Sequence, residues 1–157
     1  MNNLMPIFMK LENEPCLVVG GGKIALHKIH QLVDCKALVT AVSPKISKSI
    51  SSLLVTTINR RYQTSDLEGV KLVIAATDDK EVNQKIFEDS NKRGLLVNVV
   101  DNPNLCSFYM GSIYQDGDLK VAVSTNGKCP SFGTYIIDHI KSFSKGLWGK
   151  ALDDLAV

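Results

Sequence analysis

Three consecutive glycines directly follow a short apolar run, and this junction constrains the fold of the chain more than any other feature. Residues 16–19 carry only apolar side chains, which is typical of a strand covered on both faces of a sheet. After Gly20, Gly21 and Gly22, apolar residues recur at helical spacing over residues 23–33. The sequence therefore predicts a strand, a glycine turn and a helix, as in the first unit of an α/β sheet.

Further apolar runs continue this alternation of strands and helices. Strands are predicted at residues 37–42, 55–59, 72–76 and 95–100, and a short, weakly helical segment lies between the first two of these. A helix is predicted over residues 78–93, where Asp78 and Glu81, three residues apart, resemble a capping box. Strands separated by helices at this interval favour right-handed crossovers, so the expected fold class is α/β with a parallel, Rossmann-like sheet.

The alternation stops near residue 104. Residues 107–114 and 119–124 are predicted strands with only the turn 115–118 between them, so they must pair antiparallel. A helix is expected from residue 131 to about residue 143. We therefore expect a Rossmann-like domain over residues 1–104, followed over residues 105–157 by the small antiparallel strand pair and a shortened C-terminal helical segment.

The glycine turn has the spacing Gly20-x-Gly22-x-x-Ala25, which is typical of dinucleotide-binding sites. Glycines let the backbone approach a pyrophosphate, whose charge is stabilised by the free N–H groups and the dipole at a helix N-terminus. Lys23 and Ile24 open that helix and are expected to contact the same cofactor. A glycine turn that binds no ligand is the alternative interpretation.

The residues after two other strands bear on which dinucleotide is bound. An acidic residue usually follows the second strand and binds the adenosine ribose, but Ser43 occupies that place here. Ser43 could bond the ribose hydroxyl and Lys45 could tolerate a 2′-phosphate, so the residues alone leave NAD and NADP open. Thr77 lies near the expected nicotinamide position, although a polar residue at a helix entry explains it equally well.

Composition and cysteine spacing exclude several classes of function. Eighteen basic against sixteen acidic side chains give a net charge of +2, which offers no case for nucleic-acid binding. No apolar run approaches the roughly 20 residues of a membrane span, and no secretory signal is visible, so a cytoplasmic location is expected. The four cysteines are scattered without metal-ligand spacing, so neither a metal site nor a disulfide framework is predicted.

Six different short blocks are distributed over most of the chain, from about Pro6 to Pro130. They are Pro6-Ile-Phe8, Val18-Val-Gly-Gly-Gly22, Ala75-Ala-Thr-Asp-Asp79, Asn98-Val-Val-Asp101, Ser107-Phe108 and Val121-Ala-Val-Ser124. In this order and spacing the blocks resemble the precorrin-2 dehydrogenase/sirohydrochlorin ferrochelatase family, which also occurs as the N-terminal module of siroheme synthase.

The resemblance implies a specific activity and a specific assembly. Members oxidise precorrin-2, a tetrapyrrole, to sirohydrochlorin with NAD⁺, and some also insert Fe²⁺ to give siroheme. They are homodimers in which the antiparallel strands take part in dimerisation. By position, the three glycines match the pyrophosphate loop, Asp101 matches the active-site carboxylate, and Ser124 matches a serine near the tetrapyrrole. Asn98 and Lys128 are further expected substrate contacts, because a polycarboxylate substrate requires cationic or N–H partners.

The position of Asp101 fits a catalytic role. It follows the fifth predicted strand, at the edge of an α/β sheet where ligands bind. Dehydrogenation transfers a hydride to the nicotinamide and releases a proton, which a carboxylate within hydrogen-bond reach can accept as general base. Without the resemblance, Asp101-Asn102-Pro103 reads as a simple turn.

Two other functions stay open from the sequence. A nucleotide-sensing regulatory module of the kind that gates potassium transport would share the glycine turn and the parallel sheet but would perform no chemistry. The predicted antiparallel strand pair and the missing acidic residue after the second strand argue against it. A dehydrogenase-like subunit whose catalytic function has lapsed is the third possibility.

Overall fold

The computed structural model describes residues 3–156, which form two compact units. One unit comprises Pro6–Phe108, and the other comprises residues 109–156 together with residues 3–5. The domain division near residue 104 that the sequence suggests remains a proposal.

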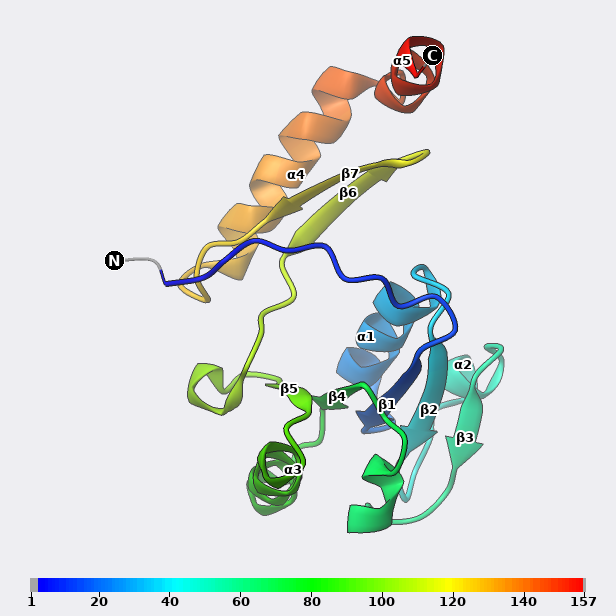
Figure 1. The fold of residues 1–157 in the computed structure, drawn as a ribbon, viewed down its shortest axis with the longest axis vertical. Coiled ribbons are helices and arrows are strands. Elements are labelled where there is room, and N and C mark those ends of the chain that lie inside the picture. The colour runs from blue at the N-terminus through cyan, green and yellow to red at the C-terminus, as the bar shows by residue number, and fades with distance from the viewer. Residues whose placement is uncertain (1–2, 157) are drawn as a thin grey trace. The chain divides into compact units, whose positions relative to one another are not determined.

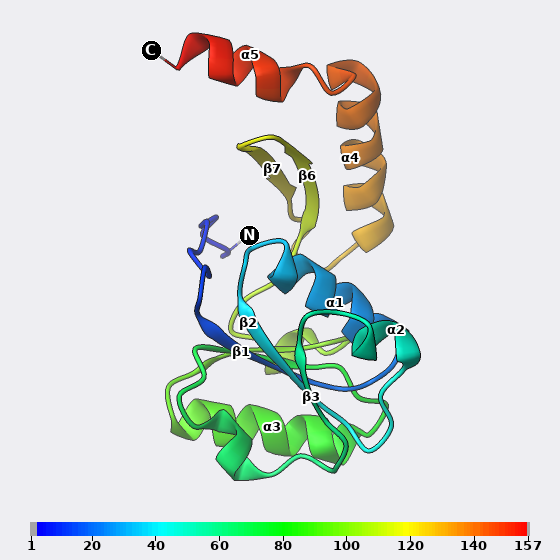
Figure 2. The same ribbon diagram turned by 90° about the vertical axis from the view of Figure 1, so that its right-hand side faces the viewer.

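A five-stranded, entirely parallel sheet forms the centre of the Pro6–Phe108 unit (Figure 1). Its strands lie in the order β3-β2-β1-β4-β5. Helices α1 and α2 lie on one face of this sheet and α3 lies on the other (Figure 2). The elements are β1 (Pro15–Val19), α1 (Lys23–Val33), β2 (Leu38–Val42), α2 (Lys48–Ser51), β3 (Thr56–Ile58), the 3₁₀ turn η1 (Thr64–Leu67), β4 (Leu72–Ala75), α3 (Lys80–Lys92), β5 (Leu96–Val99) and the 3₁₀ turn η2 (Pro103–Leu105). The predicted fold class is therefore confirmed.

The two central strands are buried on both faces, as their continuous apolar sequences predicted. All four residues of β4 are buried, and so are the last four of β1. Side chains of β1, β4 and β5 meet Ile86 of α3 in one apolar cluster, which includes Leu17, Val73 and Val97. Each such side chain stabilises the folded state by about 1.5–3 kcal/mol through loss of contact with water. This core holds the strand ends, and the loops that leave them, in a defined arrangement.

The N-cap of helix α3 lies one residue later than the sequence predicted, and the helix itself begins at Lys80. Its N-cap is Asp79, whose Oδ1 accepts hydrogen bonds from the N–H groups of Glu81 (3.0 Å) and Val82 (3.1 Å). The prediction of Asp78 as the cap was wrong, because the Thr77 hydroxyl bonds both N–H and C=O of Asp79 and so forms its own turn before the helix.

This cap gives a first testable prediction. We expect Asp79→Ala to lower the free energy of unfolding by about 1 kcal/mol, because two N–H groups at the helix start lose their acceptor. The matched control is Asp78→Ala, which removes an exposed neighbouring carboxylate that does not cap the helix, and we expect a change within about 0.5 kcal/mol. Urea denaturation followed by circular dichroism measures both values. Equal losses in the two variants would contradict the assignment of the cap.

The second unit contains an antiparallel hairpin and two helices. Strands β6 (Ser112–Asp116) and β7 (Leu119–Val123) pair through a two-residue turn, in which Gly117 has φ +58°. The predicted antiparallel pairing is confirmed, but the turn is shorter than the four residues expected. The first strand also starts later than predicted, because Ser107 bonds Val97 of β5 instead of joining the hairpin.

Helices α4 (Pro130–Ser144) and α5 (Trp148–Leu155) complete this unit. The Tyr114 hydroxyl on β6 lies 2.6 Å from Ser144 Oγ at the end of α4. Asp116 Oδ2 accepts from the N–H of Trp148 at 3.0 Å, which anchors the start of α5 to the hairpin. No helix within residues 3–156 combines the length and the apolar character needed to cross a membrane.

Candidate active site

The strand order reverses between β1 and β4, which is where open α/β sheets bind ligands, at the carboxyl ends of the strands. The glycine turn leaves β1 at this edge, and Thr77 follows β4. Ser43 directly follows β2, and Asp101 lies two residues beyond β5. The structure therefore brings the predicted cofactor residues and Asp101 to one edge of one sheet.

Gly20 and Gly21 are required by the packing of the protein itself. Gly20 has φ +141°, and a Cβ there would lie 2.3 Å from the carbonyl oxygen of Ala76. A Cβ on Gly21 would lie 1.9 Å from the carbonyl oxygen of Lys45. Both neighbours are backbone atoms, which cannot move aside cheaply. The glycine turn after β1 thus packs closely against the backbone of two segments, the one that follows β4 and the one that follows β2.

Gly22 differs from the other two glycines. A Cβ on Gly22 would meet nothing within 4 Å, so the space beside it is open. Gly22 is the N-cap of α1, no side chain caps this helix, and no acidic residue stands in its first turn. Lys23 and Ile24 at this turn are exposed. An open, uncapped helix start without negative charge favours an anion such as a pyrophosphate, and the binding of a dinucleotide at these residues remains a prediction.

The hydroxyls of Ser43 and Thr77 are both engaged in local turns. Ser43 Oγ donates to the carbonyl oxygen of Lys45 at 3.1 Å, which helps to hold that oxygen against Gly21. Thr77 Oγ1 lies 2.7 Å from Asn83 Oδ1 and 3.0 Å from the carbonyl oxygen of Asp79. Both residues therefore shape the rim of the site, and direct contact with a cofactor remains a prediction for each.

Asp101 is exposed and has φ +62°, an unusual left-handed conformation that aspartate tolerates better than most residues. It stands on a short loop whose two ends are joined by hydrogen bonds. Ser107 bonds both backbone groups of Val97, with its N–H 2.8 Å from the carbonyl oxygen and its Oγ 2.8 Å from the N–H. Cys106 Sγ bonds both backbone groups of Val99, at 3.2 and 3.3 Å. These hydrogen bonds fix the two ends of the loop that carries Asp101.

Asn98 belongs to the base of this loop. It is buried, and its Nδ2 donates to the carbonyl oxygen of Phe108 at 2.9 Å and approaches Cys106 Sγ at 3.5 Å. Its amide N–H₂ thus holds the chain segment that returns from Asp101. The substrate contact expected for Asn98 remains a prediction.

Lys28 is a charged residue in the middle of α1 that the sequence did not single out. It lies on the second turn of α1 and is half-buried, and the charged or titratable groups that act on it are Asp101 and Cys106. Burial lowers the pKa of the Lys28 ammonium, and the Asp101 carboxylate partly opposes this effect.

Ser124 and Lys128 lie in the second compact unit, after β7 and before α4. Both are exposed, and Ser124 Oγ accepts a hydrogen bond from the N–H of Asn126 at 3.2 Å. Their contact with a substrate remains a prediction.

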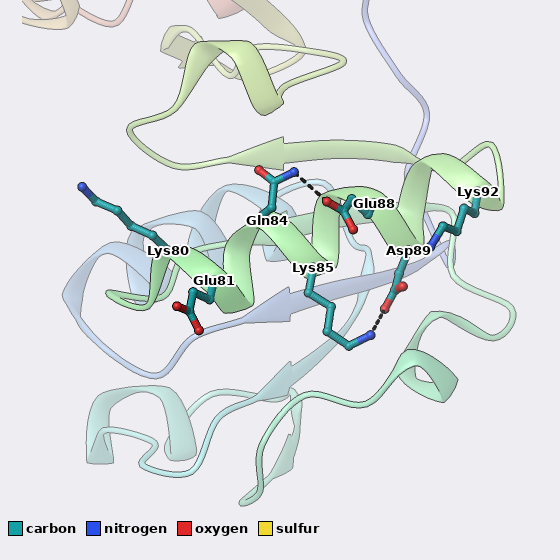
Figure 3. A pocket seen from close by; sticks show the side chains of 7 residues that line it. All are labelled: Lys80, Glu81, Gln84, Lys85, Glu88, Asp89 and Lys92. Atoms are coloured by element: carbon teal, nitrogen blue, oxygen red, sulfur yellow. Dashed lines mark hydrogen bonds and ion pairs between the residues drawn. The ribbon is translucent and has the colours of Figure 1, made fainter.

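A separate pocket of about 450 Å³ lies along α3 (Figure 3). Its lining mixes both charges, and its side chains bond one another, as in the pairs Gln84–Glu88 (2.8 Å) and Lys85–Asp89 (3.0 Å). Asp89 also accepts from Tyr62 and Thr64, so it ties η1 to α3. We assign this pocket a structural role. Its lining residues are Lys80, Glu81, Gln84, Lys85, Glu88, Asp89 and Lys92.

Comparisons with known proteins show which family this chain belongs to. Residues 7–112 match the model of a family described as "Putative NAD(P)-binding". The chain is 40% identical over 150 residues to a protein named "Siroheme synthase" from Methylobacillus flagellatus, covering 93% of this chain and 32% of that protein. A second "Siroheme synthase", from Thioalkalivibrio sulfidiphilus, is 37% identical over 152 residues, covering 94% of this chain and 31% of that protein. The chain thus spans about a third of the length of these relatives.

A solved structure titled "SirC, precorrin-2 dehydrogenase" shares the fold, with a TM-score of 0.81 and 24% identity over 96% of this chain and 76% of that one. The apo-structure of D-lactate dehydrogenase from Escherichia coli matches more distantly, with a TM-score of 0.51 and 14% identity over 63% of this chain and 32% of that one. The match of the family model covers most of the chain and includes the whole parallel sheet. The chain therefore belongs to this NAD(P)-binding family, and it is similar in sequence to siroheme synthases, as its sequence resemblance indicated.

Proposed function

We propose that this protein oxidises precorrin-2 to sirohydrochlorin with NAD⁺, as a step of siroheme biosynthesis. One observation carries the proposal: an uncapped helix start beside open space and an exposed carboxylate on a braced loop lie at the same edge of one sheet. The names of the similar proteins, siroheme synthase and precorrin-2 dehydrogenase, support the choice of substrate.

The turn at Gly22 is the proposed binding place of the cofactor. The first N–H groups of α1 would bond the pyrophosphate oxygens, and Lys23 and Ile24 would flank them. Ser43 and Thr77 would line the adenosine and nicotinamide ends, on either side of β1 in the sheet. When bound, the oxidised nicotinamide supplies the acceptor for a hydride.

Asp101 is the proposed general base. Each oxidation removes a hydride and a proton from the macrocycle, and the Asp101 carboxylate would accept that proton. Its exposure supports this role because a macrocycle can reach it, and the hydrogen bonds at the base of its loop would hold it in position during the reaction. Asn98, Ser124 and Lys128 are the proposed substrate contacts.

A direct assay tests the function. We expect the purified protein, given precorrin-2 and NAD⁺, to produce the absorption spectrum of sirohydrochlorin together with stoichiometric NADH. Absence of turnover by protein that is folded by circular dichroism would refute the proposal. Tight NADH binding without any tetrapyrrole turnover would instead favour the nucleotide-sensing module.

Insertion of Fe²⁺ into sirohydrochlorin is a second proposal for the same site. The Asp101 carboxylate could also accept a pyrrole proton as a metal enters. Within residues 3–156 no group of three His, Cys, Asp or Glu side chains is placed to hold a metal ion. In this reaction iron is a substrate, which the macrocycle receives. Repeating the assay with and without Fe²⁺, and following the siroheme spectrum, separates this activity from the dehydrogenation.

We also propose that the protein forms a homodimer and that it is located in the cytoplasm. The second unit offers exposed apolar side chains, among them Phe132, Tyr135 and Phe143, which support association with another chain. Size-exclusion chromatography with light scattering gives the mass in solution, and a monomer at micromolar concentration would contradict the homodimer.

A further inference from the structure

The sulfur of Cys106 is the centre of a small group of hydrogen bonds at the outer edge of the parallel sheet. β5 is the last strand in the sheet order, so one side of its backbone faces away from the other strands. On that side the Cys106 thiol bonds Val99, whose N–H lies 3.3 Å and whose carbonyl oxygen lies 3.2 Å from Sγ. Nδ2 of the buried Asn98 lies 3.5 Å from the same sulfur. The thiol therefore satisfies backbone groups that would otherwise bond a further strand.

The same thiol contacts both ends of the turn that carries Asp101. This turn comprises residues 99–102 and is closed by a hydrogen bond from the Asn102 N–H to the Val99 carbonyl oxygen at 3.2 Å. Asp101 is its third residue and has the left-handed φ of +62°. Cys106 Sγ lies 3.2 Å from the carbonyl oxygens of both end residues, Val99 and Asn102. Burial raises the pKa of the Cys106 thiol, so at neutral pH the sulfur keeps the proton that it donates to one of these oxygens.

We propose that Cys106 is a positioning residue, whose thiol holds the turn 99–102 so that the Asp101 carboxylate stays in place to accept the substrate proton. The proposal deepens the proposed function and rests on it. A left-handed backbone at a residue other than glycine is costly and persists only where surrounding contacts hold it. The bonds from Cys106 to both ends of the turn supply such contacts. A general base acts only while its oxygen stays within hydrogen-bond reach of the proton, so the thiol acts on the reaction through Asp101.

The test compares the kinetics of three variants of the full chain. We expect Cys106→Ala to lower kcat for precorrin-2 oxidation about tenfold, because a small displacement of the base slows proton transfer. The KM for precorrin-2 and the Kd for NAD⁺ should stay close to those of the parent. Cys106→Ser should keep a kcat near that of the parent, because a hydroxyl can donate to and accept from the same partners. The matched control is Cys16→Ala, which removes another buried thiol of this unit at the amino end of β1 and should have the parent's kcat.

A double-mutant cycle supplies a readout that a purely structural role would not move. In Asp101→Asn the base is already absent, so the thiol has no carboxylate left to position. Adding Cys106→Ala to Asp101→Asn should therefore leave the residual turnover unchanged, although the same change slows the parent. General damage to the fold would instead reduce turnover by the same factor in both backgrounds.

The outcomes separate this inference from the proposed function. If the folded parent does not turn over precorrin-2, the proposed function itself fails. If the parent is active and Cys106→Ala keeps its kcat, or loses the same factor with and without Asp101→Asn, only the role of Cys106 is overturned. Cys106→Val, which replaces the thiol with apolar atoms, serves as the second variant should Cys106→Ala not fold, and a parental kcat in that variant overturns the role in the same way.

Discussion

Asp101→Asn is expected to reduce kcat for precorrin-2 oxidation by about 10²–10⁴-fold while leaving NAD⁺ affinity nearly unchanged. The amide is close in size to the carboxylate but cannot accept the proton that leaves the macrocycle. Asparagine also tolerates the left-handed backbone at this position (φ +62°), so the loop should keep its shape. Stopped-flow absorbance for turnover and calorimetry for NAD⁺ binding give the two quantities.

A matched control isolates the role of this one carboxylate. Asp34→Asn changes another exposed aspartate of the same unit, at the end of α1, and should have wild-type kcat. A proportional loss of turnover and NAD⁺ affinity in Asp101→Asn would remove the catalytic role, because it would indicate damage to the whole site. Turnover unchanged by Asp101→Asn would leave the loop as the simple turn that its sequence also allows.

The second large effect is expected in the glycine turn, where substitution of Gly21 should lower stability and NAD⁺ affinity and substitution of Gly22 should lower NAD⁺ affinity alone. Gly21→Ala forces a methyl group to within 1.9 Å of the Lys45 carbonyl oxygen, so the backbone must shift. We expect a loss of about 3 kcal/mol in the free energy of unfolding, together with loss of NAD⁺ binding. Urea denaturation and calorimetry measure the two changes.

Gly22→Ala is the matched variant one residue along the chain. Its backbone, at φ −94°, suits any residue, and its methyl would meet no protein atom within 4 Å. Stability should therefore change by no more than about 0.5 kcal/mol. The methyl would stand where the pyrophosphate approaches α1, so NAD⁺ affinity should fall about tenfold, which corresponds to about 1.4 kcal/mol. Wild-type NAD⁺ affinity in Gly22→Ala would place the cofactor elsewhere.

Much of the fold could be predicted because its strands are apolar on both faces. The runs that became β1 and β4 are buried throughout, and such runs separated by helical patterns indicate a parallel sheet. The predicted ends of helices and strands were less accurate where a side chain forms a hydrogen bond that the local sequence pattern does not indicate. The Thr77 hydroxyl bonds the N–H of Asp79, and Asp79 is the N-cap of α3. Ser107 bonds Val97 of β5 and takes no part in the hairpin. Neither hydrogen bond can be predicted from the local sequence pattern.

Some features of the candidate site could likewise be predicted from the sequence, and others could not. The glycine spacing after β1 is a local signal that could be found in the sequence, and the family comparison agrees with the cofactor it predicts. The carboxylate of Asp101 was singled out only through the resemblance of its block to the family, because its local pattern is that of a turn. The sequence could not show that Gly20 and Gly21 are needed for packing whereas Gly22 borders open space. Gly21 is needed because the segment after β2 presses on it, and this contact joins residues that are far apart in the chain.

By itself, the amino-acid sequence determined the strand–turn–helix start and the parallel sheet, because these follow from the spacing of apolar residues and glycines along the chain. The resemblance of its six blocks also indicated the family. Tertiary structure alone decided which glycine faces open space and how the hydrogen bonds of Ser107 and Cys106 hold the Asp101 loop. Contacts between distant segments depend on how helices pack on the sheet, and that packing is a property of the assembled core.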